Sequence, residues 1–180
     1  MIRADALRHL KPGGYIELQD LCFPSRCIEP ELNDTSHQIK WSLHCMEAAV
    51  RIGINLQAPL AWPDQLRAVG FTDIHIKWFN WPIGPWAKQK KNKMLGRYVF
   101  ANFYDAVAAP NALFTRVLGW SIDEVNILLA HVRNEHKEQK VHLYQQICFA
   151  YARKPQEVRE DDPTAATPAA EATASTKASG

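Results

Sequence analysis

A short turn at residues 11–14, Lys-Pro-Gly-Gly, separates two stretches of different periodicity near the start of the chain. Apolar residues of segment 2–10 recur at helical spacing, whereas residues 15–21 alternate as in a strand. Proline cannot continue a helix and glycine adopts positive φ without strain, so the turn ends the helix and redirects the chain. A helix, a tight turn and a strand in this order predict an α/β fold.

The remaining periodicity predicts an incomplete α/β fold of about three strands with four to five helices. Segment 71–79 has one polar face, formed by Asp73, His75 and Lys77, which indicates a strand near the edge of the sheet. Ser121 and Glu124 form a capping box that begins a late helix. The predicted helices cover 2–10, 33–52, 63–70, 92–107 and a segment after Ser121, and the predicted strands cover 15–21, 71–79 and 145–152.

The end of the chain has a different composition. Alanine, threonine and proline replace every large hydrophobe after Val158. Such a segment buries too little apolar surface to offset the entropy lost on ordering. We therefore expect a folded unit over residues 1–154 and a disordered Ala/Thr/Pro-rich tail over 155–180.

Charge is nearly balanced, with 21 Lys and Arg against 19 Asp and Glu. The sequence therefore gives no clear sign of nucleic-acid binding and none of membrane adsorption. No apolar run is long enough for a membrane span, and segment 1–11 lacks a signal-peptide hydrophobic region, which favours a cytoplasmic or nuclear protein. A local cluster of cations is either the solvated start of a helix or an anion-facing patch: Lys88, Lys90, Lys91, Lys93 and Arg97.

The cysteines are expected to be reduced thiols in such a compartment. Cys22, Cys27, His44 and Cys45 are close in sequence, but their spacing matches no standard zinc pattern, so no metal site is predicted.

Four runs of sequence carry a resemblance to a known family: LRHLKPGGYIELQD (7–20), WPDQLRAVGFTDIHIKWF (62–79), the run from VLGWSIDEV to VHLY (117–144) and FAYARKP (149–155). The chain resembles the C-terminal half of a class I S-adenosylmethionine-dependent methyltransferase, and more narrowly the fungal LaeA-like methyltransferases. The resemblance implies a Rossmann-like fold and methyl transfer from S-adenosyl-L-methionine to a small-molecule or protein acceptor, in fungal secondary metabolism.

The chain departs from this family in the part that holds the cofactor. The family uses a glycine-rich loop after the first strand and an acidic residue ending the second, and this sequence has neither. Its close pair, Gly13 and Gly14, precedes a strand, whereas a nucleotide cradle lies between a strand and a helix N-terminus. The resemblance would make the three strands the fifth, sixth and seventh of seven, which implies a truncated or remnant methyltransferase whose binding of the cofactor by itself is doubtful.

The resemblance also has a consequence for strand 15–21. In the family's sheet this strand lies between an earlier strand and the last one, and the earlier strand is missing here. An apolar strand edge would be left open. We therefore expect a homodimer or a protein partner at this edge, or low stability.

Three polar side chains lie toward the end of strand 15–21. Ligands of open α/β sheets bind beyond the carboxyl ends of parallel strands, which makes Glu17, Gln19 and Asp20 candidates for substrate or cofactor contacts. They would orient an acceptor hydroxyl or amine, or take up a proton. The alternative is that Asp20 caps the following loop and Glu17 faces solvent.

Three further candidates follow the second predicted strand, 71–79. Trp86 lies in an aromatic, proline-rich loop that the resemblance places over a substrate pocket, although a packing anchor is the alternative. Asn102 shares a helix face with Leu95 and Val99, which predicts a buried amide, and Tyr98 lies on the same helix. The competing functions are a methyltransferase, a non-catalytic interaction module acting with a regulatory partner, and a fragment without function.

Overall fold

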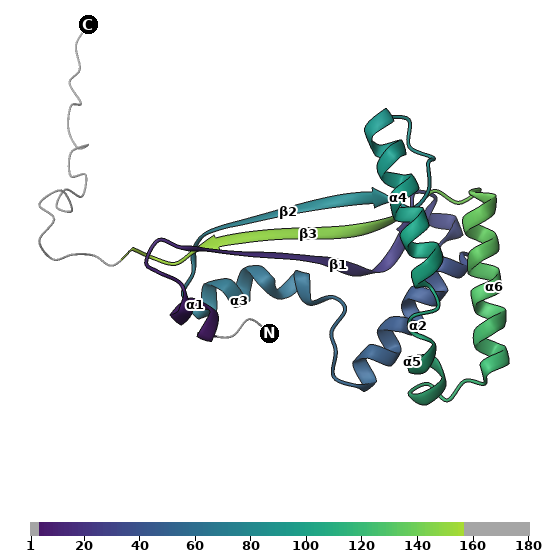
Figure 1. Ribbon diagram of the computed structural model, residues 1–180, viewed down its shortest axis with the longest axis horizontal. Helices are drawn as coiled ribbons and strands as arrows, with labels where there is room; N and C mark the ends of the chain where they lie inside the picture. Colours follow the sequence, from purple (N-terminus) through teal and green to yellow (C-terminus); the bar gives the residue numbers. More distant parts are fainter. Residues whose placement is uncertain (1–3, 157–180) are drawn as a thin grey trace, which may run out of the picture.

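The computed structural model describes residues 4–156 as a three-stranded sheet with helices on one face and at one end (Figure 1). Of the disordered tail predicted over 155–180, residues 157–180 lie outside the described residues. The elements in chain order are α1 (Ala4–His9), β1 (Tyr15–Cys27), η1 (Pro30–Leu32), α2 (His37–Arg51), η2 (Ala58–Ala61), α3 (Trp62–Val69), β2 (Thr72–Pro82), α4 (Lys90–Ala106), α5 (Asn111–Arg116), α6 (Ile122–Glu138) and β3 (Leu143–Arg153).

The sheet has the strand order β1-β3-β2, and β3 runs antiparallel to both neighbours. The strands β1 and β2 are therefore parallel to each other, with their carboxyl ends at the same end of the sheet. Both predicted placements are confirmed: the first strand pairs with the last one, and the strand predicted near an edge is an edge strand.

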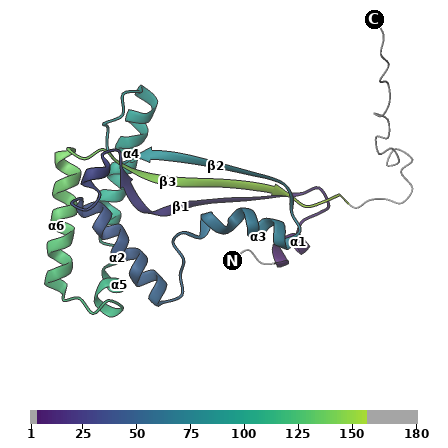
Figure 2. The ribbon, with the colours of Figure 1, turned by 180° about the vertical axis from the view of Figure 1, so that it is seen from behind.

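One face of the sheet packs on α1 and α3, which both views place on the same side (Figures 1 and 2). Leu66 of α3 is fully buried there against small side chains of β3, Ala150 and Ala152. Small residues on the central strand let the helix approach closely, and the α3 helix then ends at Gly70, whose φ of +104° suits glycine. This apolar cluster is the core of what we call the sheet region: α1, α3 and the strands above them.

The four helices α2, α4, α5 and α6 gather at the carboxyl end of β1 and β2 and form a helical lobe (Figure 1). Its core contains Trp41, Phe114, Val125 and Val132. The α4 helix is fixed to the loop after β2 by a close backbone approach, since a Cβ atom on Gly96 would lie 2.0 Å from the carbonyl oxygen of Gly84. Only glycine fits there.

The mixed α/β class and the three strands are confirmed, and so is the capping box of α6. The differences lie at element ends and in the lobe. Strand β1 continues six residues past the predicted end at Leu21, to Cys27, and the short α5 was not predicted, so residues 4–156 hold six α-helices and not four to five. Residues 30–32 form a 3-10 turn, and the helix predicted over 33–52 begins at His37.

Candidate functional site

A small apolar cavity opens where β1 meets the helical lobe, toward the carboxyl ends of the parallel strands. Its volume is about 160 Å³. We call it the end pocket, and it is lined by Leu21, Phe23, Trp41, Asn102, Phe103 and Ala106. The aromatic rings of Phe23 and Trp41 lie 6.2 Å apart between centroids and form one wall.

Polar groups are scarce in the end pocket. The indole N–H of Trp41 donates to the carbonyl of Val107 at 3.1 Å, so it is already paired. The side-chain amide of Asn102 stands at the rim and is exposed. A ligand here would therefore gain mostly apolar contact, with Asn102 as the one side chain that orients it.

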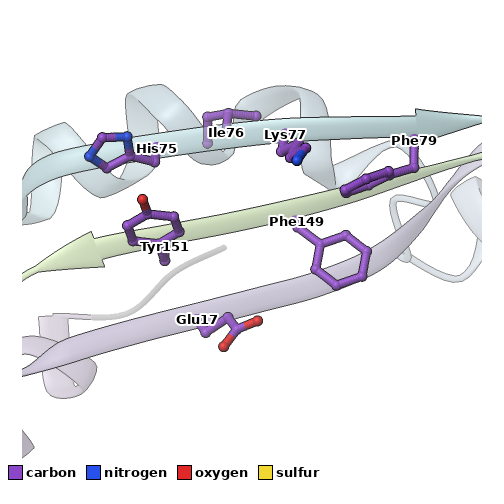
Figure 3. A pocket seen from close by; sticks show the side chains of 7 residues that line it. All are labelled: Glu17, His75, Ile76, Lys77, Phe79, Phe149 and Tyr151. Carbon is purple, nitrogen blue, oxygen red and sulfur yellow. The ribbon is translucent and has the colours of Figure 1, made fainter.

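A second, larger cavity lies on the open face of the sheet, away from α1 and α3 (Figure 3). We call it the face pocket. Its volume is about 360 Å³, and its lining consists of Glu17, His75, Ile76, Lys77, Phe79, Phe149 and Tyr151. The His75 and Tyr151 rings stack at 4.6 Å, and the Lys77 ammonium lies 5.1 Å from the centre of the Phe79 ring. Four of the lining side chains are therefore already in contact with one another, as one ring stack and one cation–π pair.

The structure separates the three β1 candidates. Because β1 runs on to Cys27, Glu17 and Gln19 lie in the first half of the strand, far from its carboxyl end. Both side chains are on the open face, and Gln19 Nε2 donates to Glu17 Oε1 at 2.6 Å. Asp20 stands opposite Cys148, and its carboxylate accepts the N–H of Leu21 at 2.8 Å. Of the three, only Glu17 lines the face pocket, and none lines the end pocket.

Trp86, Tyr98 and Asn102 also lie apart. Trp86 is half-buried and its indole N–H donates to the carbonyl of Leu143 at 2.9 Å, which fixes the loop to β3. Tyr98 is 70% exposed on α4. The expectation of a buried amide at Asn102 is wrong, because the buried stripe of α4 runs through Gly96 and Val99 and leaves Asn102 exposed beside it.

The sequence analysis missed a buried polar network that joins the sheet to the lobe. Each bond has a direction: Gln38 donates to Ser25, Ser25 donates to Gln145, and Gln145 donates to the carbonyl of Cys22, at 3.0, 3.0 and 2.7 Å. Gln38 Oε1 then accepts from His136 Nε2 at 2.9 Å. The side chains of this network are at most 3% exposed. Their spread along the sequence gives no local signal of the network.

His136 is the titratable member of this network. Its Nδ1 is buried and meets no hydrogen-bond partner among residues 4–156. Burial lowers the pKa of His136 to about 4, so the ring is neutral at physiological pH. Since Nε2 must donate to Gln38, the unpaired Nδ1 is the deprotonated nitrogen.

The four cysteines are free and buried. Burial raises the pKa of Cys45 to about 12 and that of Cys148 to about 11, so neither thiol is a nucleophile at neutral pH. Within the described part of the chain, no group of three or more His, Cys, Asp or Glu side chains is arranged to hold a metal ion. No helix among residues 4–156 is long and apolar enough to cross a membrane.

The described residues do not fit S-adenosylmethionine. The Gly13–Gly14 turn lies between α1 and the amino end of β1, and the Gly13 N–H donates to the carbonyl of Lys154. A Cβ atom on Gly14 would lie 2.9 Å from the carbonyl oxygen of Lys11, so the pair closes a tight turn. No glycine-rich loop joins a strand to a helix N-terminus anywhere between residues 4 and 156.

Comparison with known proteins gives methyltransferase relatives. The chain is similar to a probable methyltransferase, tdiE, of Emericella nidulans, with 29% identity over 83% of this chain and 48% of that protein. It is 30% identical to the methyltransferase pytC of Aspergillus terreus, over 82% of this chain and 46% of pytC. The secondary metabolism regulator laeA of Monascus pilosus is 28% identical over 82% of this chain and 40% of laeA. The chain is thus a homologue of fungal methyltransferases and of a secondary metabolism regulator, which confirms the resemblance.

Two facts limit what these relatives imply. The chain spans about half the length, or less, of the curated relatives it matches. No family model matches the sequence. Among solved structures, a Haemonchus contortus Phospholethanolamine N-methyltransferase 2 in complex with phosphomonomethylethanolamine and S-adenosylhomocysteine covers 85% of this chain and 29% of that one, with 14% identity and a TM-score of 0.32.

Proposed function

We propose that this chain forms the acceptor side of an S-adenosylmethionine-dependent methyltransferase, and that the acceptor belongs to fungal secondary metabolism. The end pocket is the observation that carries the proposal. It lies toward the carboxyl end of β1, where open α/β sheets bind their ligands, and the helical lobe supplies its walls. Methyl transfer depends mainly on positioning the acceptor, for which an apolar pocket with one amide is suited.

The chemistry of the lining defines the class of acceptor group. Phe23, Trp41 and Phe103 favour a flat or compact apolar body, and the volume of about 160 Å³ limits it to a small ring or a short alkyl chain. The exposed Asn102 amide would hold a hydroxyl or carbonyl at the rim. The cofactor would be bound by residues outside 4–156, because the described glycines do not form a cradle.

A binding experiment tests the pocket separately from the cofactor. Small phenols serve as probes, and heteronuclear NMR of the full chain reports which residues they perturb. We expect shifts at Leu21 and Ala106, and loss of binding in Ala106→Leu, which fills the pocket from its rim. The matched control is Ala101→Leu on the same helix, where the side chain is also exposed and lines no part of the pocket. Probe binding unaffected by Ala106→Leu would rule out the end pocket as the acceptor site.

Calorimetric titration with S-adenosylhomocysteine tests the other half of the proposal. We expect no heat for this chain alone at high micromolar ligand, because the cofactor cradle is missing from the described residues. Binding in the micromolar range would instead make the chain a self-sufficient cofactor-binding unit.

The α4 helix favours a second candidate function, that of a non-catalytic interaction module. The cationic cluster predicted from sequence is exposed: Lys88 precedes α4, and the other members lie in the first half of that helix. None of these side chains forms an ion pair with a residue in 4–156. Met94 and Tyr98 add exposed apolar surface on the same helix. The test is whether the chain captures a partner protein that the double variant Lys91→Glu, Lys93→Glu no longer holds. This result, together with no binding of phenol probes by the chain, would favour an interaction module.

A further inference from the structure

Strand β1 forms one edge of the sheet, so β3 pairs with only one side of its backbone. The N–H of Lys154 donates to the carbonyl of Gly14, and the pairing register with β3 is unbroken over residues 15–22. Alternate residues of an antiparallel strand direct their N–H and C=O groups to the same side. Even-numbered residues of β1 therefore face β3, and the residues whose backbone faces outward are Tyr15, Glu17, Gln19 and Leu21.

This outward edge is open over a short and definite segment. Beyond it, the N–H of Phe23 donates to the carbonyl of Leu56 at 3.1 Å. The Asp20 carboxylate already covers the N–H of Leu21. The outward N–H groups of Tyr15, Glu17 and Gln19 meet no acceptor within residues 4–156.

Natural sheets protect such edges with bulges, prolines or lysines. The opposite edge strand, β2, has such a device: its register with β3 breaks between Thr72 and His75, and Asp73 between them adopts a φ of +49°. Segment 15–21 of β1 has no register break, no proline and no lysine. The two edges of one sheet therefore differ: segment 15–21 of β1 keeps a regular register, whereas β2 has a register break.

We propose that two copies of this chain pair through β1, antiparallel and about a two-fold axis at Leu18. In this register Glu17 of each copy stands opposite Gln19 of the other, and both residues have their backbone groups facing outward. Each such pair then exchanges both of its N–H···O=C bonds. Tyr15 stands opposite Leu21 at the two ends, and these apolar side chains are 58% and 37% exposed in the single chain.

Side-chain chemistry selects this register over its neighbours. The Gln19 amide has two N–H donors, one of which already binds its own Glu17, so the second is free for the partner's carboxylate. Moving the axis to Glu17 would place two carboxylates directly opposite each other, which is destabilising. Moving it to Gln19 would place each Glu17 carboxylate opposite an apolar Leu21 and leave it without the partner's amide.

The pairing edge and the end pocket share Leu21, whereas Glu17 and Gln19, at the centre of the pairing, do not line that pocket. Two copies joined at β1 form one continuous sheet, in which the face pockets of both lie on the same side.

Sedimentation velocity and light scattering of the full chain across a concentration series test this proposal. We expect a reversible monomer–dimer equilibrium. Gln19→Glu places carboxylates opposite each other twice per dimer and should raise the dissociation constant on the order of tenfold. Gln19→Lys creates two opposite-charge pairs and should lower it. Circular dichroism of each variant reports whether the monomer fold is intact.

Asn80→Glu is the matched control, since it makes the same amide-to-carboxylate change at an exposed position of the other edge strand. It should leave the equilibrium unchanged. Gln19→Pro provides a second variant, because it removes an outward N–H and leaves the bonds to β3 in place. A monomer at every concentration, equal dissociation constants for Gln19→Glu and Gln19→Lys, or an equal effect of Asn80→Glu would each overturn the proposal.

Discussion

The core of the sheet region and the junction between the sheet and the helical lobe are both buried, but they are held together by different interactions. The core between α3 and the sheet is apolar throughout, with Leu66 fully buried against small residues of β3. At the junction, Ser25, Gln38, Gln145 and His136 form a directed chain of hydrogen bonds at most 3% exposed. Apolar burial depends on shape and volume, whereas a buried polar chain requires every partner to be present.

The largest effect is expected in the sheet region. Leu66→Ala should lower the free energy of unfolding by about 4 kcal/mol, because it removes a fully buried side chain and leaves a cavity between α3 and β3. Chemical denaturation measures the loss. Leu60→Ala is the matched control, since Leu60 is 59% exposed and its loss should change stability by less than about 0.5 kcal/mol. Similar losses for the two variants would mean that the sheet region lacks a close-packed core.

The same contrast explains what the sequence could predict. Alternation in 15–21, 71–79 and 145–152 reports which side of a strand is buried, and this signal is local, so all three strands were predicted. The polar network joins residues more than a hundred positions apart, such as Ser25 and Gln145, and no local pattern reports it. A buried glutamine looks like a surface one in a sequence.

The candidate site was predictable only in part. The carboxyl end of β1 was the expected location, and a pocket lies toward it, but it is lined by Leu21 and Phe23 and not by Glu17 or Asp20. The prediction ended the strand too early, since β1 continues through Pro24 to Cys27. Of the six predicted residues, only Asn102 lines the end pocket. Its helical spacing from Val99 was read correctly, but it lies at the exposed border of the buried face of α4 and not within it.

A pH titration should separate the two regions next. The pKa of His136 is lowered to about 4 in the folded chain, below its ordinary value of 6.5, so the unfolded chain binds more protons between these values. The free energy of unfolding therefore keeps its full value above pH 6.5 and decreases by about 3 kcal/mol as the pH drops toward 4. Protonation would place an unpaired N–H at Nδ1 in an apolar setting beside Phe100.

Denaturation of the wild type and of His136→Gln at pH 7, 5.5 and 4.5 measures this effect. The difference between the two proteins should shrink or reverse as the pH falls. The pKa of His37 is also lowered, by burial and by neighbouring His131, so its contribution to the stability of the fold also decreases as the pH falls. Part of the pH dependence of the wild type should therefore persist in His136→Gln. His75→Gln, at an exposed position of the sheet, is the control and should retain the full dependence. An unchanged dependence in His136→Gln would show that the junction is not the pH-sensitive part.

The smallest of these effects isolates the hydrogen bonds themselves. Gln145→Leu keeps the approximate volume but leaves the buried Ser25 O–H without its acceptor and removes the side-chain donor to the Cys22 carbonyl. The cost should be about 2 kcal/mol. Gln146→Leu, one residue further along β3, loses only a 3.4 Å contact with the exposed amide of Asn80 and should cost less than about 0.5 kcal/mol. If the two leucine variants unfold at the same denaturant concentration, the network orders the junction without stabilising it. The contrast between the two regions would then be one of specificity alone, since only the apolar core would contribute free energy.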